Sequence, residues 1–185
     1  GSEVQQCGNG VRCVARILAA DPEHSTSFTL ESPAGPVSAR VDDELVSVSM
    51  GTPEFEPERI PFLADARSDR YTLDLDGQAL EICAVSMGTP HCVLEVPEVH
   101  TAAVTELGPI IEHHARFPEQ CNVGFMKIVD SANIDLRVHE RGVGETLACG
   151  TGACAAVCYG QAHEQLGERV TVRRPGGVVV VSWRG

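Results

Sequence analysis

The stretches Cys7-Gly8-Asn9-Gly10 and Cys149-Gly150-Thr151-Gly152 repeat one pattern, cysteine, glycine, any residue and glycine, in front of two apolar segments. The first segment predicts a helix whose buried stripe has helical spacing and is formed by Val11, Val14, Ala15 and Leu18. The second predicts a closely packed helix, because it contains small residues such as Ala153, Ala156 and Gly160. We therefore expect two helices that begin directly after a cysteine and end near Asp21-Pro22 and Glu164.

A cysteine at the start of a helix suits acid/base chemistry. Its sulfur lies near unpaired backbone N–H groups and the positive end of the helix dipole, which favour the thiolate. Such sites lower a thiol pKa from about 8.5 to roughly 3.5–7.5. The glycines that follow let backbone N–H groups approach an anion such as a carboxylate. Two such sites facing one amino-acid α-carbon predict a two-base racemase, in which one thiolate removes the α-proton and the opposite thiol donates another.

Length and composition indicate a globular protein. With 185 residues, 43% of them hydrophobic, the chain suits one large or two small domains. A net charge of −12 without a basic cluster argues against binding to nucleic acid or to anionic membrane surfaces. We expect no membrane segment and a cytoplasmic location, because the sequence shows neither a run of about 18 apolar residues nor the pattern of a signal peptide.

The chain contains eight cysteines, which raises two alternatives to thiol catalysis. A disulfide framework is disfavoured, because a chain of this size can build an apolar core without crosslinks. A metal site is also disfavoured, because the C-x4-C-x3-C spacing of Cys149, Cys154 and Cys158 departs from that of plant-type ferredoxins. Six cysteines are instead expected to be small buried apolar residues, namely Cys13, Cys83, Cys92, Cys121, Cys154 and Cys158.

The remaining pattern predicts an α+β fold with mostly antiparallel strands. Gly51-Thr52-Pro53 and the prolines up to Pro61 suggest a crossing between domains at 1–50 and 51–185. The first domain is expected to have strands at 27–32, 36–41 and 45–50, with a turn at Pro33-Ala34-Gly35. In the second, strands are expected at 71–75, 79–86, 92–96, 123–130, 134–139, 169–174 and 178–183. Two short helices are expected at 101–107 and 109–114, the second beginning at Pro109.

Five blocks of the sequence together resemble the diaminopimelate epimerase family, whose enzymes act without pyridoxal in lysine and peptidoglycan precursor synthesis. They span essentially the whole chain and are Cys7–Cys13, Ser86–Val93, Asn122–Met126, Val138–Thr146 and Ala148–Ala155. The resemblance implies two pseudo-symmetric domains, each wrapped around a central helix that carries one cysteine at its start. It also implies no cofactor and no metal. A pyridoxal mechanism is disfavoured independently, because the only lysine, Lys127, lies in a predicted strand.

The resemblance also assigns roles to individual residues. Cys7 and Cys149 correspond to the acid/base thiols, while His91 and Glu140 correspond to residues that assist them. The substrate's reacting carboxylate is expected on backbone amides and its distal end on side chains, a set comprising Gly8, Asn9, Gly150, Thr151, Asn122 and Arg141. A bidentate guanidinium is well suited to a distal carboxylate. Thr89 stands where the family usually has asparagine, which predicts a weaker contact to that end.

Taken without the resemblance, the same residues have ordinary structural explanations. His91 fits a hydrogen-bonded structural histidine, and Glu140-Arg141 fits a solvated ion pair at a strand end. Asn122 fits a residue that shapes a turn. The other histidines, including His139, are expected to have surface or packing roles.

Family members have a segment before Gly1 and a strand after Gly185, so we expect this chain to be a fragment with a partial first domain and a nearly complete second one. Exposed strand edges in that first domain favour association, such as a homodimer. Three alternative functions remain: a proline racemase-like isomerase, a catalytically silent fragment, and a redox or metal-binding protein.

Overall fold

We describe a computed structural model for residues 7–21, 23, 25–32 and 35–185. The chain divides into two compact units, Gly1–Thr52 and Pro53–Gly185. Pro22, and Pro33 and Ala34 of the expected turn, lie outside the described residues.

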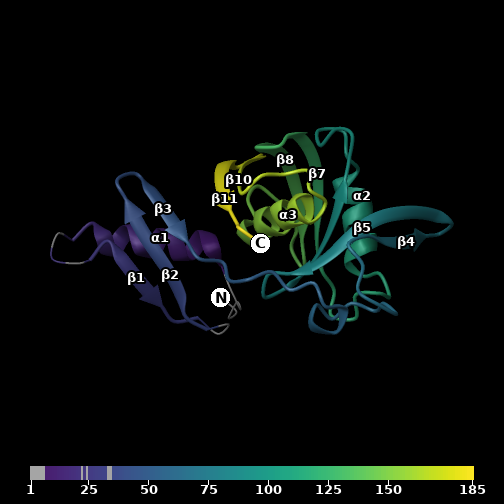
Figure 1. Ribbon diagram of the computed structural model, residues 1–185, viewed down its shortest axis with the longest axis horizontal. Helices are drawn as coiled ribbons and strands as arrows, with labels where there is room; N and C mark the ends of the chain where they lie inside the picture. Colours follow the sequence, from purple (N-terminus) through teal and green to yellow (C-terminus); the bar gives the residue numbers. More distant parts are fainter. Residues whose placement is uncertain (1–6, 22, 24, 33–34) are drawn as a thin grey trace. The chain divides into compact units, whose positions relative to one another are not determined.

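The first unit is a helix packed on a small antiparallel sheet (Figure 1). Helix α1 (Gly8–Ala19) is followed by strands β1 (Ser27–Leu30), β2 (Val37–Asp42) and β3 (Leu45–Val48). The strands pair in the order β1-β2-β3. The small core joins Ala15 of α1 to Ala39 and Val41 of β2. The expected helix and all three strands are therefore present, with ends that differ by at most two residues from those expected.

The buried stripe of α1 differs from the expected one. Val14 is 45% exposed, and the helix instead packs through Val11, Ala15 and Ala19, which are spaced four residues apart. Three short strands cover only a narrow line of the helix surface. The prediction that Val14 is buried was therefore wrong.

The second unit is an eight-stranded mixed sheet with two helices. Its strands are β4 (Tyr71–Leu75), β5 (Gln78–Ser86), β6 (Pro90–Glu95), β7 (Asn122–Asp130), β8 (Asn133–Glu140), β9 (Gly144–Thr146), β10 (Arg169–Arg174) and β11 (Gly177–Ser182). They are ordered β11-β10-β8-β7-β6-β5-β4, with β9 also paired to β8. The β6–β7 and β8–β10 pairs are parallel and the other pairs antiparallel. The expected α+β class is confirmed.

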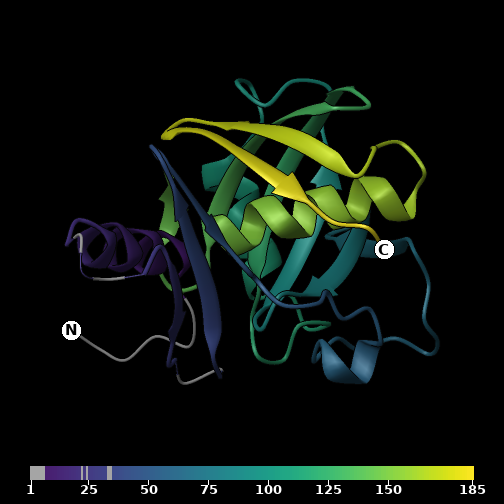
Figure 2. The ribbon, with the colours of Figure 1, turned by 60° about the vertical axis from the view of Figure 1, so that its left-hand side comes forward.

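Helices α2 (Val104–Glu112) and α3 (Gly150–Ala162) cover opposite faces of this sheet (Figure 1). Neighbouring residues of β8 show this, because side chains alternate between the two faces of a strand. Val138 faces α3, where a Cβ added at Gly152 would lie 3.0 Å from its Cγ2 atom. His139 faces α2, where a Cβ added at Gly108 would lie 2.6 Å from its ring. The β10–β11 hairpin runs along α3 (Figure 2).

Helix α2 is continuous, which contradicts the expected break before Pro109. Pro109 lies inside the helix. A proline normally clashes with the residue before it, but here that residue is Gly108, which has no Cβ. The helix therefore gives up one backbone hydrogen bond but avoids the contact between the proline ring and a preceding Cβ. Strand β9 was not predicted, and a 3-10 turn at Pro57–Arg59 lies within the expected crossing.

The cysteines follow the expected burial with two exceptions. Cys83, Cys92, Cys121 and Cys158 are buried, as predicted for small apolar residues. Cys13 is exposed and Cys154 only partly buried. The prediction failed for Cys13 because it lies on the side of α1 that the narrow sheet does not cover.

Candidate active site

Cys149 forms the N-cap of α3. Its backbone is extended, with φ −110° and ψ 119°, and its Sγ atom accepts a hydrogen bond from the Gly152 amide at 3.3 Å. The Thr151 hydroxyl lies 3.4 Å from the same sulfur. The residue is only 6% exposed. Gly152 packs closely against this sulfur, since a Cβ there would lie 3.3 Å from it.

The surroundings of Cys149 favour the thiol over the thiolate. Burial raises the pKa of the Cys149 thiol, and the negative charge of Glu140 raises it further. Hydrogen bonds from Thr151 and Gly152 lower this pKa but do not offset the burial. The expectation that the helix N-terminus leaves this thiol with a depressed pKa was therefore wrong for Cys149.

Cys7 repeats the same cap in the other unit. Its backbone is extended, with φ −139° and ψ 91°, and its Sγ atom accepts from the Gly10 amide at 3.4 Å. Gly8 lies against Met50, since an added Cβ would be 3.0 Å from the Met50 sulfur. The side chain of Asn9 accepts a hydrogen bond from Arg12. Cys7 is exposed within the described structure, whereas Cys149 is buried.

Three of the predicted residues form a row across neighbouring strands of the second unit. His91 on β6 pairs with Asn122 on β7 in parallel register. Val123 pairs with His139, so the antiparallel register places Glu140 of β8 across from Asn122. Because Val138 and Glu140 lie on the same side of β8, this row lies on the face that α3 covers. The charge of Glu140 acts on Cys149 from this position.

Asn122 connects the row to the turn that follows β8. Its Oδ1 atom accepts from the Arg141 amide at 3.0 Å, which fixes the orientation of the side-chain amide. Its Nδ2 atom is therefore directed toward Thr89 Oγ1 at 3.3 Å and His91 Nε2 at 3.4 Å. Asn122 thus holds the turn that follows β8, as expected for a residue that shapes a turn. It also lies beside the candidate residues His91 and Thr89.

His91 is a neutral imidazole. Burial and the nearby positive charge of Arg141 lower the pKa of His91 to about 3. Because Asn122 Nδ2 can only donate, the Nε2 atom facing it is assigned as an acceptor and the proton to Nδ1. Thr89 Oγ1, 3.4 Å from Nε2, joins the same network. His91 therefore acts on its surroundings by hydrogen bonding, without a positive charge.

Glu140 and Arg141 bind separate partners. They do not form the solvated ion pair with each other that the structural alternative predicts. Glu140 accepts a hydrogen bond from the Thr146 hydroxyl of β9. The Arg141 guanidinium donates to the Glu119 carbonyl at 3.0 Å. That bond uses one of the five N–H donors of the guanidinium.

Two buried residues beside the turn that follows β8 were not predicted as site residues. Glu112 and His139 are 4% and 5% exposed, and their Oε2 and Nε2 atoms lie 2.7 Å apart. The alternation of β8 gives no signal for a buried His139, since the residues two and four before it are the charged Arg137 and Asp135. Only the close approach of α2, at Gly108, buries that side chain.

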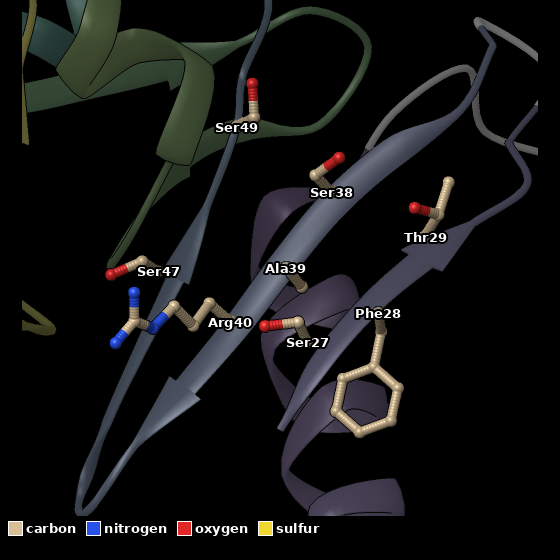
Figure 3. Close-up of a pocket in the computed structure, with 8 residues that line it drawn as sticks. All are labelled: Ser27, Phe28, Thr29, Ser38, Ala39, Arg40, Ser47 and Ser49. Atoms are coloured by element: carbon tan, nitrogen blue, oxygen red, sulfur yellow. The ribbon is translucent and has the colours of Figure 1, made fainter. Parts of the chain in front are cut away.

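The described part of the first unit also carries a shallow pocket on its sheet, shown in Figure 3. It is lined largely by hydroxyl groups and one guanidinium, from Ser27, Thr29, Ser38, Ser47, Ser49 and Arg40. Figure 3 shows α1 behind the opposite face of this sheet. None of the predicted site residues, Cys7 included, lines this pocket.

Solved structures with a similar fold include epimerases. The structure of a hydroxyproline epimerase from Agrobacterium vitis matches 99% of this chain and 59% of its own, with a TM-score of 0.70 and 15% identity. A phenazine biosynthesis protein of the PhzF family from Bacillus anthracis matches 97% of this chain and 68% of its own, with a TM-score of 0.65 and 17% identity. The chain therefore has the fold shared by these proteins.

Sequence similarity identifies the family. The family model described as diaminopimelate epimerase matches residues 83–185. The diaminopimelate epimerases of Alkalilimnicola ehrlichii and Thioalkalivibrio sulfidiphilus are 49% and 51% identical to this chain over its full length. The chain spans 68% and 67% of those relatives. It belongs to the diaminopimelate epimerase family, a family of isomerases, and the resemblance seen in the sequence is confirmed.

The described residues include no helix that is long and apolar enough to cross a membrane.

Proposed function

We propose that this chain interconverts LL- and meso-2,6-diaminopimelate, with Cys7 and Cys149 as the two acid/base groups. The observation that carries the proposal is the repeated helix cap. In both units the cysteine sulfur accepts the amide of the second glycine, at 3.4 Å for Cys7 and 3.3 Å for Cys149. Family membership supplies the substrate class.

The two thiols would exchange one proton each with the α-carbon. In one direction the Cys7 thiolate takes the α-proton, and the electron pair left behind is delocalised into the carboxylate. The Cys149 thiol then donates its proton to the opposite face, which inverts the configuration. Burial favours the protonated form of Cys149, which suits this donor role. General acid–base catalysis of this kind contributes about 10²–10⁴-fold.

Backbone amides would stabilise the negative charge that grows on the reacting carboxylate. The first N–H groups of an α-helix have no acceptor within the helix, and the helix dipole favours an anion there. The amides of Gly8 and Asn9 begin α1, and those of Gly150 and Thr151 begin α3. Fixed donors aimed at a developing charge are an effective source of transition-state stabilisation.

The network around Asn122 would recognise the distal amino-acid end. Arg141 supplies a guanidinium for the distal carboxylate. Neutral His91 and the Thr89 hydroxyl, both hydrogen-bonded near Asn122, offer polar groups without adding positive charge. Glu140 would assist Cys149 by keeping its thiol protonated until the transfer.

This chemistry requires neither pyridoxal nor a metal ion, and it requires reduced thiols. All eight cysteines lie among the described residues and are free. A reducing compartment such as the cytoplasm suits that requirement. We accordingly place the activity in cytoplasmic synthesis of lysine and peptidoglycan precursors.

The test is α-proton exchange. We expect the reduced chain to incorporate deuterium from D₂O into LL-diaminopimelate and to form the meso isomer. Cys7→Ala and Cys149→Ala should each slow inversion by about 10²–10⁴-fold, whereas Cys13→Ala, on the exposed side of α1, should retain it. Exchange with hydroxyproline but not with diaminopimelate would replace the proposal with a proline racemase-like activity. Exchange with neither substrate would contradict it.

A further inference from the structure

Glu112 is a buried carboxylate whose two oxygens both have partners. It is the last residue of α2 and is 4% exposed. Its Oε1 atom accepts from the Gly142 amide at 2.8 Å, and its Oε2 atom lies 2.7 Å from His139 Nε2. Burial raises the pKa of Glu112, but the hydrogen bonds from His139 and Gly142 hold this pKa below its ordinary value. The group is therefore a carboxylate at neutral pH.

His139 orients this carboxylate because α2 approaches β8 very closely. A Cβ added at Gly108 would lie 2.6–2.7 Å from His139 ring atoms and Cβ, so a glycine is required where the helix meets the ring. The ring is 5% exposed, with its Nε2 atom directed at Glu112. The position of the carboxylate is thus fixed by the packing of a helix on a sheet.

The Gly142 amide adjoins the substrate-recognition residue Arg141. Consecutive peptide groups are held from two sides, since Asn122 Oδ1 accepts from the Arg141 amide and Glu112 Oε1 accepts from the Gly142 amide. Gly142 has a φ of +72°, a left-handed conformation that glycine adopts without steric cost. Movement of either peptide group would displace the Arg141 side chain.

We propose that Glu112, oriented by His139, is a positioning residue that holds the Arg141–Gly142 backbone and thereby sets the affinity for the distal end of the substrate. This inference rests on the proposed function for the role of Arg141. A purely structural pair would instead stabilise the junction of α2 and β8 without affecting substrate affinity.

Two variants of Glu112 separate these roles. Glu112→Ala removes the acceptor of the Gly142 amide, so we expect the KM for diaminopimelate to rise about tenfold, the order expected from one lost hydrogen bond to a charged group. The effect on kcat should be smaller. Glu112→Gln retains a carbonyl oxygen that can accept from Gly142, and the His139 tautomer with its proton on Nδ1 presents Nε2 as an acceptor to the new amide. We expect Glu112→Gln to restore KM to within about threefold of the unmodified chain, a difference smaller than one neutral hydrogen bond.

A neighbouring variant provides the control for stability. Ile111→Val alters the adjacent, fully buried residue of α2 and is expected to cost about 1 kcal/mol of unfolding free energy. It retains the Glu112 carboxylate that accepts from the Gly142 amide, so its KM should not change. If Ile111→Val raises KM as much as Glu112→Ala does, the positioning role is wrong.

Amide hydrogen exchange tests the contact without relying on activity. We expect the Gly142 amide to be protected in the unmodified chain and in Glu112→Gln, and to lose protection in Glu112→Ala while α3 amides remain protected. Unchanged protection of Gly142 in Glu112→Ala would overturn the inference. Absence of turnover in the unmodified chain would instead contradict the proposed function, and the exchange result would still decide whether Glu112 holds this turn.

Discussion

The N-terminal ends of α1 and α3 have nearly the same local geometry and very different surroundings. Cys7 and Cys149 are both extended caps whose sulfurs accept the third amide along, at 3.4 and 3.3 Å. Cys7 is exposed, whereas Cys149 is 6% exposed and has a raised thiol pKa. A short motif therefore determines how the sulfur is held, while the packing around it determines which protonation state is favoured.

The difference arises from what each helix packs against. Helix α1 has one buried residue, Ala15, and lies on a three-stranded sheet. Helix α3 has eight buried residues and contacts strands β5, β6, β7, β8 and β11. The larger sheet removes Cys149 from water, and desolvation then outweighs the amide of Gly152 in setting the pKa of the thiol.

The largest expected effect tests whether both caps are needed for catalysis. Cys7→Ala and Cys149→Ala should each lower kcat/KM for epimerisation by about 10²–10⁴-fold, because each removes one acid/base group. Stereochemical assay of both isomers would measure the loss. Full inversion in either variant would show that the two caps are not equivalent partners in one reaction.

A smaller effect should separate the two thiols by reactivity. We expect iodoacetamide to modify Cys7 at least about tenfold faster than Cys149 at neutral pH, because the thiolate is the nucleophile and Cys149 is both buried and protonated. The raised pKa of Cys149 means that its modification rate should continue to increase with pH into the alkaline range. Peptide mapping by mass spectrometry resolves the two sites.

Equal modification rates for Cys7 and Cys149 would remove the proposed contrast. Cys13→Ser serves as the control, since it eliminates the other exposed cysteine of α1 and should leave both rates unchanged.

A matched pair of glycine substitutions compares how tightly the caps are packed. Gly152→Ala places a Cβ 3.0 Å from Val138 Cγ2 and should cost about 1–2 kcal/mol of unfolding free energy. In Gly10→Ala the nearest atom is Cys7 Sγ at 3.4 Å, and the gain in helix propensity should leave stability within about 1 kcal/mol of the unmodified chain. Denaturant unfolding measures both. A greater loss in Gly10→Ala would contradict the comparison.

The smallest expected effect concerns the charge beside Cys149. Glu140→Gln removes a carboxylate that raises the pKa of this thiol, so the pH profile of Cys149 modification should move to lower pH. Glu145→Gln, which alters an ion pair with Arg137, should leave that profile in place. A shift to higher pH in Glu140→Gln would mean that Glu140 does not act on the thiol in this way.

Much of the fold was predictable because alternation and turn residues are local signals. The strands observed at Tyr71–Leu75 and Arg169–Arg174 have the expected boundaries. The break predicted at Pro109 is absent from α2, where Gly108 offers the proline ring no Cβ to clash with. The prediction that Val14 is buried was wrong, because the helix sequence does not show how wide the sheet that covers the helix is.

The site was less predictable, because it depends on contacts between distant segments. Cysteine caps are local and were expected, whereas the row of His91, Asn122 and Glu140 depends on strand order. Strands β6 and β7 are parallel and separated by α2, so alternation alone could not pair them. The contact of Glu112 with His139 depends on how closely α2 approaches β8, which no spacing in the sequence reveals.

The row formed by His91, Asn122 and Glu140 also limits how the length of these strands can change. Inserting or deleting one residue within a strand reverses the face of every side chain beyond it. A single-residue change near the row would therefore move one of its members to the α2 side of the sheet. The ladder between β7 and β8 does contain an irregularity, between Ile128 and Asp130, but it lies at the end away from Asn122. The irregularity thus leaves Asn122 in register with Glu140.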